Sequence, residues 1–168
     1  LQEVGQAAQT IPSMSGRALV PEPPSGSIVR FSKSGFLYVA VRNGNRWETS
    51  ATSSGQGFID KTMLWDEMCS KARNFEIATR WAEVTNPATR DDRLTHQAIV
   101  HFVRDGKLVG AIAIDRAYSG SNSRSWYTTL SKNSGGKKVG SWSDILPNPQ
   151  HVEVATGWEP IGPLEVSR

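Results

Sequence analysis

Two glutamates occupy the same place in two similar segments of the chain, and their chemistry is considered first. Glu76 lies in Phe-Glu-Ile-Ala-Thr-Arg-Trp and Glu153 in Val-Glu-Val-Ala-Thr-Gly-Trp. Two carboxylates that meet could act as a general acid and a general base. In an alternating strand, however, each falls on the face opposite the apolar side chains, where it meets water or pairs with arginine. The sequence favours this second interpretation.

The three histidines and the single cysteine form no recognisable site in the sequence. His96, His101 and His151 lack the short spacing to Cys, Asp or Glu that a metal site requires. His101 stands where the first segment has Arg30, which indicates an exposed strand position. Cys69 has no evident histidine partner and is predicted to be a buried, inert thiol. We therefore predict no catalytic residue, no metal and no cofactor.

A lysine-rich loop is the first candidate contact site. Residues 131–140 contain Gly135-Gly136 and several lysines, so backbone amides and cations could meet a phosphate there. The spacing is not that of a P-loop, and a flexible basic turn is the alternative interpretation. The equivalent loop of the first segment, residues 53–60, has no lysine. The basic candidates are Arg116, Arg124, Lys132, Lys137 and Lys138.

Tryptophans are the second kind of candidate. All six fall into equivalent pairs, namely 47 with 126, 65 with 142 and 81 with 158. Repeated tryptophans usually belong to a core. If any are exposed, the candidates are Trp47 and Trp126, because each begins a threonine-rich strand beside an arginine and could stack on bases or grip a peptide.

These equivalences indicate an internal duplication, the pattern to look for before any other. Ile-Val-Arg-Phe at 28–31 returns as Ile-Val-His-Phe at 99–102, and Trp-Glu-Thr-Ser at 47–50 returns as Trp-Tyr-Thr-Thr at 126–129. The offset between the copies grows from 71 to 79 residues. The added residues fall in the Ser/Gly/Asn-rich stretch 115–125, where a loop tolerates insertion.

Each copy is predicted to be a β-β-β-(helix or turn)-β unit. Turns are expected at Gly35 and at Asn43-Gly44. Asp60 is predicted to cap a helix whose apolar face begins at Leu64. The second copy allows only a turn there, because two prolines follow. Strands are expected at 28–31, 36–42, 46–51 and 75–81, and at the equivalent positions of the second copy.

The predicted fold is mainly β, of the α+β class. A unit of about 60 residues buries little apolar surface alone, so the two repeats should pack as one pseudo-twofold body. Proline-rich sequence at the amino end indicates an extended arm. The predicted parts are an arm at 1–26, repeat 1 at 27–84, a linker at 85–98, repeat 2 at 99–162 and a tail at 163–168.

Composition excludes several classes of protein. Hydrophobic residues make up 38% and charged residues 21%, which argues against bulk disorder and coiled coil. The apolar runs are too short to cross a bilayer, and one cysteine cannot form an internal disulfide. The net charge of +3 aids solubility without specifying a partner. We expect a cytoplasmic protein without membrane contact.

Three segments carry a resemblance. Phe36-Leu37-Tyr38-Val39-Ala40-Val41, Trp126-Tyr127-Thr128-Thr129 and the Trp-containing turn at 140–146 resemble segments in small proteins of actinobacterial phages. The resemblance implies a phage accessory or particle protein, located in the host cytoplasm or the virion. It implies no catalytic residue.

Three functions are therefore considered. The sequence favours a non-enzymatic interaction protein that binds a protein partner or itself, because no polar residues converge on a catalytic pattern. The first alternative is nucleic-acid binding through the basic loops of the second repeat, with strong salt dependence. The second alternative is a small-molecule or nucleotide binder, or an enzyme, with a site between the repeats.

Overall fold

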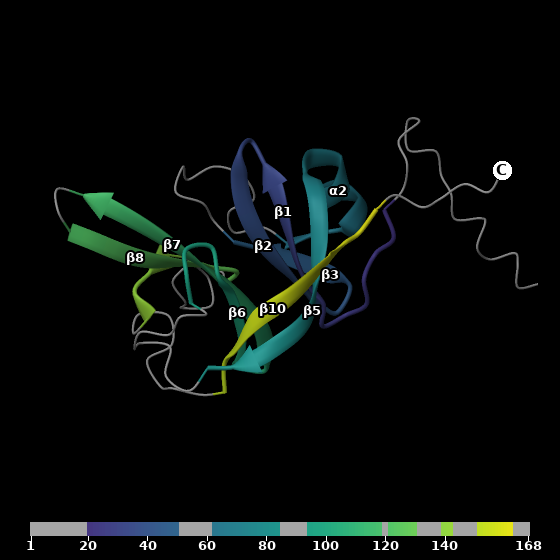
Figure 1. Cartoon of the computed structure of the whole chain (residues 1–168). Coiled ribbons are helices and arrows are strands. Elements are labelled where there is room, and N and C mark those ends of the chain that lie inside the picture. Colours follow the sequence, from purple (N-terminus) through teal and green to yellow (C-terminus); the bar gives the residue numbers. More distant parts are fainter. Residues whose placement is uncertain are drawn as a thin grey trace, which may run out of the picture.

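The computed structural model describes residues 20–50, 62–84, 94–118, 121–130, 139–142 and 151–162 (Figure 1). They form one curled antiparallel sheet of ten strands and one helix, so the predicted mainly β class is confirmed. We call residues 20–84 the first half and residues 94–162 the second half. The elements are β1 Ile28–Lys33, β2 Phe36–Asn43, β3 Arg46–Thr49, β4 Thr62–Met63, α2 Trp65–Lys71, β5 Arg73–Glu83, β6 Ile99–Arg104, β7 Lys107–Tyr118, β8 Ser121–Thr128, β9 Val139–Gly140 and β10 Glu153–Pro160.

Two-residue turns join the first strands of each half. Ser34 and Gly35 connect β1 to β2, and Asp105 and Gly106 connect β6 to β7, all with positive φ. Two successive positive φ values define the tight turn that matches the twist of a hairpin. The turn between β2 and β3 begins at Gly44, with φ of 70°. The predicted turns at Gly35 and Asn43-Gly44 are therefore confirmed.

The last strands of the two halves lie side by side at the centre of the sheet. The strand order is β4-β3-β2-β1-β5-β10-β6-β7-β8-β9. The hairpin β1–β2 flanks β5, and the hairpin β6–β7 flanks β10 (Figure 1). The two-residue strands β4 and β9 stand at the edges. One continuous sheet therefore joins both halves of the chain.

Curling of the sheet brings β2 against β7, a contact that we call the seam. Gly110 permits the close approach, because a Cβ there would lie 3.0 Å from Val41 Cγ1 and 3.2 Å from Val39 Cγ2. At the end of β2, the side-chain amide of Asn43 bonds the backbone of Leu108 on β7. Packing and hydrogen bonding together hold the curl closed.

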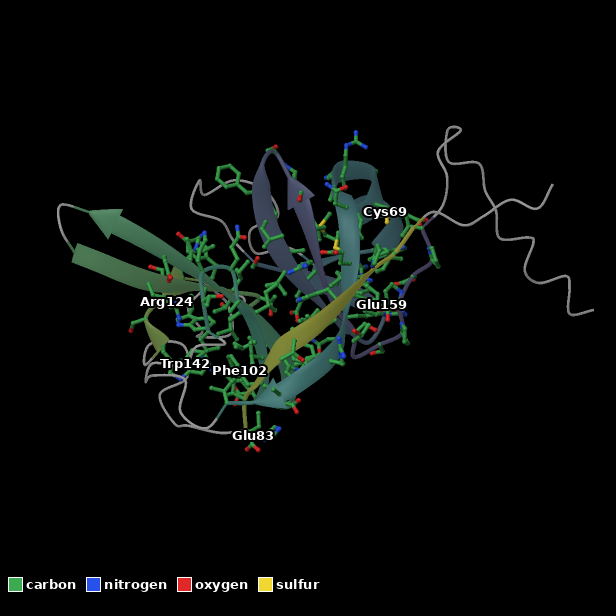
Figure 2. The ribbon with its side chains drawn as sticks, in the orientation of Figure 1. Cys69, Glu83, Phe102, Arg124, Trp142 and Glu159 are labelled. Carbon is green, nitrogen blue, oxygen red and sulfur yellow. The ribbon has the colours of Figure 1, made fainter. Side chains whose placement is uncertain are left out.

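Three apolar clusters form the core. The first cluster belongs to the first half and includes Trp47 and Trp65. The second consists mainly of residues of the second half, with Val84 from the first half, and includes Trp126 and Trp142, with Trp142 beside Phe102 (Figure 2). The third cluster fills the space between the halves. Its buried members are Ile28, Val39, Val41, Ile99, Ile112 and Tyr127.

Helix α2 covers the first cluster with Trp65 and Met68. Acidic residues in its first turn and Lys71 in its last turn complement the helix dipole. Leu64 stands at the N-cap and is 50% exposed, so its predicted place on the apolar face is wrong. Asp60, the predicted cap, lies outside the described residues, as does the turn predicted in the second half. The described part of the chain contains no helix that is long and apolar enough to cross a membrane.

The last strand of each half changes face part-way along. Phe75 and Ile77 pack in the first cluster, whereas Trp81 packs against the third. Val154 and Trp158 divide between the second and third clusters in the same way. The register of β5 and β10 shifts at the centre of the pair, and such bulges break the two-residue alternation. The alternation expected for these two strands therefore does not hold along their whole length.

The segments before β1 and β6 pack on the body. The carbonyl of Val20 accepts a hydrogen bond from Trp65 Nε1 at 2.7 Å, and Glu22 Oε2 accepts one from Trp47 Nε1 at 2.9 Å. Leu94 is buried in the second cluster. The described ends of the predicted arm and linker, residues 20–26 and 94–98, therefore contribute to the fold.

Candidate functional site

Trp47 and Trp126 do not form a contact surface. Their exposed fractions are 0% and 2%, respectively. Each packs at 5.0 Å between ring centroids against a second tryptophan, Trp65 in the first half and Trp142 in the second. Burial leaves no ring face for a base or a peptide, so the exposure on which their candidacy depended is absent. The core interpretation of the repeated tryptophans holds for these four.

Arg124 lies on β8 and is paired with Asp115, its cross-strand neighbour on β7. Both residues stand at the base of the part of the β7–β8 hairpin that extends beyond the neighbouring strands. Nε and Nη2 of Arg124 donate to the two carboxylate oxygens at 2.6 and 2.9 Å. The hydrogen bond from Arg124 holds the pKa of Asp115 below its ordinary value. Because this ion pair neutralises the guanidinium locally, Arg124 braces the β7–β8 hairpin and offers little net charge to a polyanion.

Of the other basic candidates, only Arg116 lies among the described residues. Arg116 lies on β7 opposite Ser123 of β8, in the same extension. Lys132, Lys137 and Lys138 lie outside the described residues, so the predicted phosphate-binding loop remains a prediction. The structure therefore brings Arg116 and Arg124 onto one hairpin.

That hairpin extends beyond the strands that flank it. β7 pairs with β8 from Ala111 to Tyr118, but its pairing with β6 ends at Ile112. β8 pairs with β9 only at Trp126 and Tyr127. Residues 114–118 and 121–125, which we call the projecting hairpin, therefore have no strand partner on their outer edges among the described residues. Figure 1 shows them pointing away from α2.

Hydrogen bonds fix the base of the projecting hairpin. The backbone N–H of Asp115 donates to His96 Nδ1 at 3.0 Å. The backbone N–H of Gln97 donates to the carbonyl of Ala113, and the N–H of Ala113 donates to the carbonyl of Ala98. A segment held at its base in this way is preorganised, which lowers the entropy lost when it binds a partner.

The two glutamates are far apart and each has a basic partner. Glu76 accepts a hydrogen bond from Arg30 Nε at 2.7 Å, and Glu153 accepts one from His101 Nε2 at 2.7 Å. Glu76 sits opposite Pro160 in the central strand pair, whereas Glu153 sits at its other end. Seven strand residues correspond to about 20 Å, so no acid–base pair forms. The favoured interpretation, pairing with a basic residue, holds for Glu76.

His101 is more buried than its strand position suggested. Its side chain is 22% exposed and stacks on Trp81 with 3.9 Å between ring centroids. The hydrogen bond from His101 holds the pKa of Glu153 below its ordinary value. His151 adds longer contacts to Glu153 and Glu83, at 3.6 and 3.4 Å. The expectation of an exposed His101 is wrong, because the ring covers Trp81.

Metal-ligating and thiol side chains are the remaining candidates for chemistry. In the described ranges, no three His, Cys, Asp or Glu side chains are arranged to hold a metal ion. Cys69 is only half-buried, and it packs against the first cluster. Its inertness stays a prediction.

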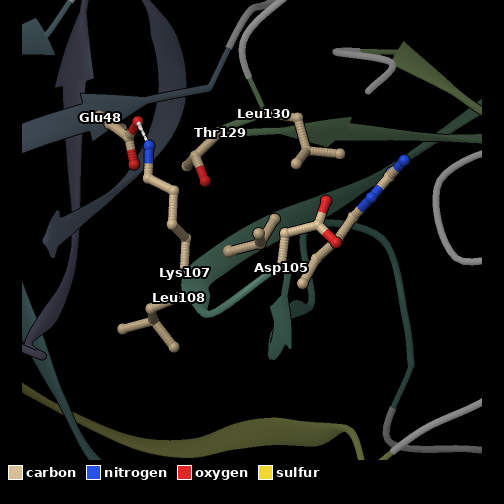
Figure 3. Close-up of a pocket in the computed structure, with 8 residues that line it drawn as sticks. Glu48, Asp105, Lys107, Leu108, Thr129 and Leu130 are labelled. Carbon is tan, nitrogen blue, oxygen red and sulfur yellow. Dashed lines mark hydrogen bonds and ion pairs between the residues drawn. The ribbon is translucent and has the colours of Figure 1, made fainter. Parts of the chain in front are cut away.

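A small open hollow of about 50 Å³ lies where the halves meet near the β6–β7 turn (Figure 3). Lys107 Nζ reaches across to Glu48 Oε2 at 3.0 Å. Arg104 and Asp105 add one further charge of each sign, so the hollow has no charge preference for a ligand. Its lining is Glu48, Arg104, Asp105, Lys107, Leu108, Val109, Thr129 and Leu130.

No protein-family model, curated protein or solved structure matches the chain. Sequence reasoning missed the pairing of Arg30 with Glu76 and of His101 with Glu153. The signal was present, because Arg30 and His101 are equivalent and so are the two glutamates. It also missed the seam, because Asn43 was interpreted only as a turn residue.

Proposed function

We propose that the chain is a non-enzymatic binding protein that recognises a protein partner through the projecting hairpin. The observation that carries the proposal is the pair of outer edges without strand partners in the described structure, on a hairpin whose base is fixed. Unpaired strand edges present backbone donors and acceptors to another chain.

The composition of the hairpin supports a protein partner. Residues 116–125 read Arg-Ala-Tyr-Ser-Gly-Ser-Asn-Ser-Arg-Ser. Tyrosine, serine, glycine and asparagine dominate binding loops of antibodies, because tyrosine supplies contact area and the small polar residues supply adaptable hydrogen bonds. A nucleic-acid site is less well supported, since Arg124 is neutralised by Asp115 and the two candidate tryptophans are buried.

The proposal includes an internal duplication with pseudo-twofold symmetry. It is supported by the strand order, which reads alike from either edge when β1–β5 are matched with β6–β10. At the centre, Ala78 pairs with Trp158 and Trp81 pairs with Ala155. Hydroxyl groups of Ser50 and Thr129 accept equivalent hydrogen bonds from the N–H groups of residues 39 and 110. The extension of the second half is then an added feature on a shared scaffold.

The first half supplies the design of a test. Its equivalent hairpin closes with Gly44-Asn45 between Asn43 and Arg46. Replacing residues 115–124 by Gly-Asn would close the second hairpin in the same way. Because the first half folds with this short turn, we expect the thermal midpoint to change little. The matched control is Ser34→Asp, which gives the β1–β2 turn the sequence of the β6–β7 turn.

The binding readout uses photo-crosslinking in cells of the native host. A photoreactive amino acid is placed at Tyr118 in the projecting hairpin and, in a separate variant, at the exposed Val103 on β6. We expect a defined protein adduct from position 118 only, and loss of that protein's binding to purified shortened chain. Retained binding by the shortened chain would refute the recognition role. A nucleic-acid adduct would favour the alternative function.

If the chain is phage-encoded, as the resemblance implies, the proposed partner is a virion or host protein. We propose a role as an accessory or particle protein on that basis. The same crosslinking experiment distinguishes these partners, because the adduct is identified by mass spectrometry. An adduct between two copies of this chain would instead indicate self-assembly.

A further inference from the structure

The side-chain amide of Asn43 makes three hydrogen bonds at the seam. Its Nδ2 donates to the carbonyl of Leu108 at 3.0 Å and to Glu48 Oε1 at 2.8 Å. Its Oδ1 accepts from the N–H of Leu108 at 3.1 Å. One amide therefore satisfies both backbone groups of a residue on the opposite strand, as a neighbouring strand would.

This arrangement closes the curled sheet without strand pairing. β2 pairs with β1 and β3, and β7 pairs with β6 and β8, but β2 and β7 share no ladder. Besides van der Waals packing at Gly110, the Asn43 amide joins β2 to β7, and the Lys107–Glu48 ion pair joins β7 to the neighbouring strand β3. Both donor and acceptor functions of the amide are needed, because Leu108 offers one acceptor and one donor.

Asn43 is followed by Gly44, the sequence in which asparagine deamidates most readily. The backbone nitrogen of Gly44 attacks Cγ of Asn43, a C–N bond forms, and Nδ2 leaves as ammonia. Water then opens the cyclic imide to aspartate or isoaspartate, so the net reaction consumes one water and releases one ammonia. Glycine favours the attack because it has no Cβ to shield its nitrogen.

In the closed seam both reacting groups are engaged. The N–H of Gly44 donates to Ser25 Oγ at 3.1 Å, and the amide of Asn43 is held by Leu108 and Glu48. Attack therefore requires the seam to open. Once formed, the carboxylate can donate to neither the Leu108 carbonyl nor Glu48, and it places a second negative charge beside Glu48.

We propose that Asn43 is a site of spontaneous deamidation, and that its conversion irreversibly unlocks the seam between β2 and β7. The folded chain protects the site, and each opening of the seam exposes it. The modification thus records how often the seam opens. This inference is independent of the recognition role of the projecting hairpin.

The first experiment follows deamidation of the full chain in mildly alkaline buffer, by peptide mass spectrometry and isoaspartate detection. We expect conversion at Asn43 to be at least several-fold slower in the folded chain than in urea. Asn45, which precedes Arg46, is the internal control and should convert much more slowly in urea. Ser25→Ala frees the Gly44 N–H and should speed conversion in the folded chain. Equal rates at Asn43 with and without urea would overturn protection by the seam.

The second experiment tests the consequence of conversion. Asn43→Asp mimics the aspartate product, and we expect a lower urea midpoint than for the original chain. Glu48→Gln in the Asn43→Asp background removes the repulsion and offers a donor, so it should recover part of the loss. Glu48→Gln alone is the control. An Asn43→Asp variant as stable as the original chain would refute the unlocking role.

Discussion

The two ends of the central strand pair hold the same arrangement with different basic groups. At one end, Arg30 bonds Glu76 and lies 4.3 Å from the ring centroid of Trp158. At the other, His101 bonds Glu153 and stacks on Trp81. In both, the basic residue and glutamate come from one half and the tryptophan from the other. Each half therefore covers an aromatic ring of its partner half.

The difference between the ends lies in hydrogen-bonding capacity. The Arg30 guanidinium is charged under all ordinary conditions and carries several donors. His101 uses Nε2 for Glu153, and its buried Nδ1 has no hydrogen-bond partner within the described chain. An unsatisfied buried nitrogen costs stability. The comparison teaches that the tryptophan cover is shared by both ends, whereas the histidine end leaves a buried nitrogen without a hydrogen-bond partner among the described residues.

The largest expected effect concerns the seam, where one strand has Val39 and the opposite strand has Gly110. Gly110→Val would place methyl groups where a Cβ alone already lies 3.0 Å from Val41. Overpacking of this kind costs up to about 3 kcal/mol. The measurement is urea denaturation, with Gly162→Val as the control, because a Cβ there meets nothing within 4 Å. Equal stability of the two variants would contradict a tight seam.

Truncating the tryptophans tests whether the two ends are equivalent. Trp81 and Trp158 are half-buried, so Trp81→Ala and Trp158→Ala should each cost about 2 kcal/mol, less than for a fully buried ring. Thermal and urea unfolding of both variants provide the measurement. If the two variants lose unfolding free energies that differ by more than one hydrogen bond contributes, the two ends are not equivalent. Val103→Ala, at an exposed position, is the control and should change little.

The sequence predicted local structure better than it predicted the closing contacts. Turns at Gly35 and Gly44 and strands at 28–31 and 36–42 follow from residue type and alternation, and the structure has them. The face change at Trp81 depends on bulges in a pairing between distant strands, which alternation within one strand does not reveal. The seam likewise depends on which strands the curl brings together, and no local pattern encodes it.

The candidate site was predicted only in part for the same reason. Arg116 and Arg124 were chosen for charge, but the register of β7 and β8 decides that Arg124 meets Asp115. Tryptophan exposure depends on packing with a second tryptophan many residues away, so sequence spacing could not decide it. The stretch 115–125 was recognised as an insertion, but its projection from the sheet follows from where β6 and β9 end.

Removing the basic groups should reveal the difference between the ends. Arg30→Ala loses a half-buried ion pair and the cover of Trp158, and we expect a cost of about 1 kcal/mol. His101→Ala should cost less, because it also removes the unsatisfied Nδ1. Double-mutant cycles with Glu76→Gln and Glu153→Gln isolate each pair. A larger coupling energy for the histidine pair would reverse the interpretation.

The smallest expected effect is a pH dependence at the histidine end. The pKa of Glu153 lies below its ordinary value of 4.5, chiefly because His101 donates to it. A depressed pKa stabilises the fold above the ordinary value, and this contribution is lost as the pH falls through the folded pKa. Glu153→Gln should therefore lower stability at neutral pH by less than about 1 kcal/mol. The difference from the original chain should disappear in acid.

Unfolding midpoints of both chains from neutral pH into acid provide the measurement. Glu159→Gln removes a carboxylate from the same strand without touching His101, so it controls for the change in net charge. A Glu153→Gln curve that stays parallel to that of the original chain below the ordinary pKa would show that the hydrogen bond from His101 does not depress that pKa. The histidine end would then differ from the arginine end in donor number alone.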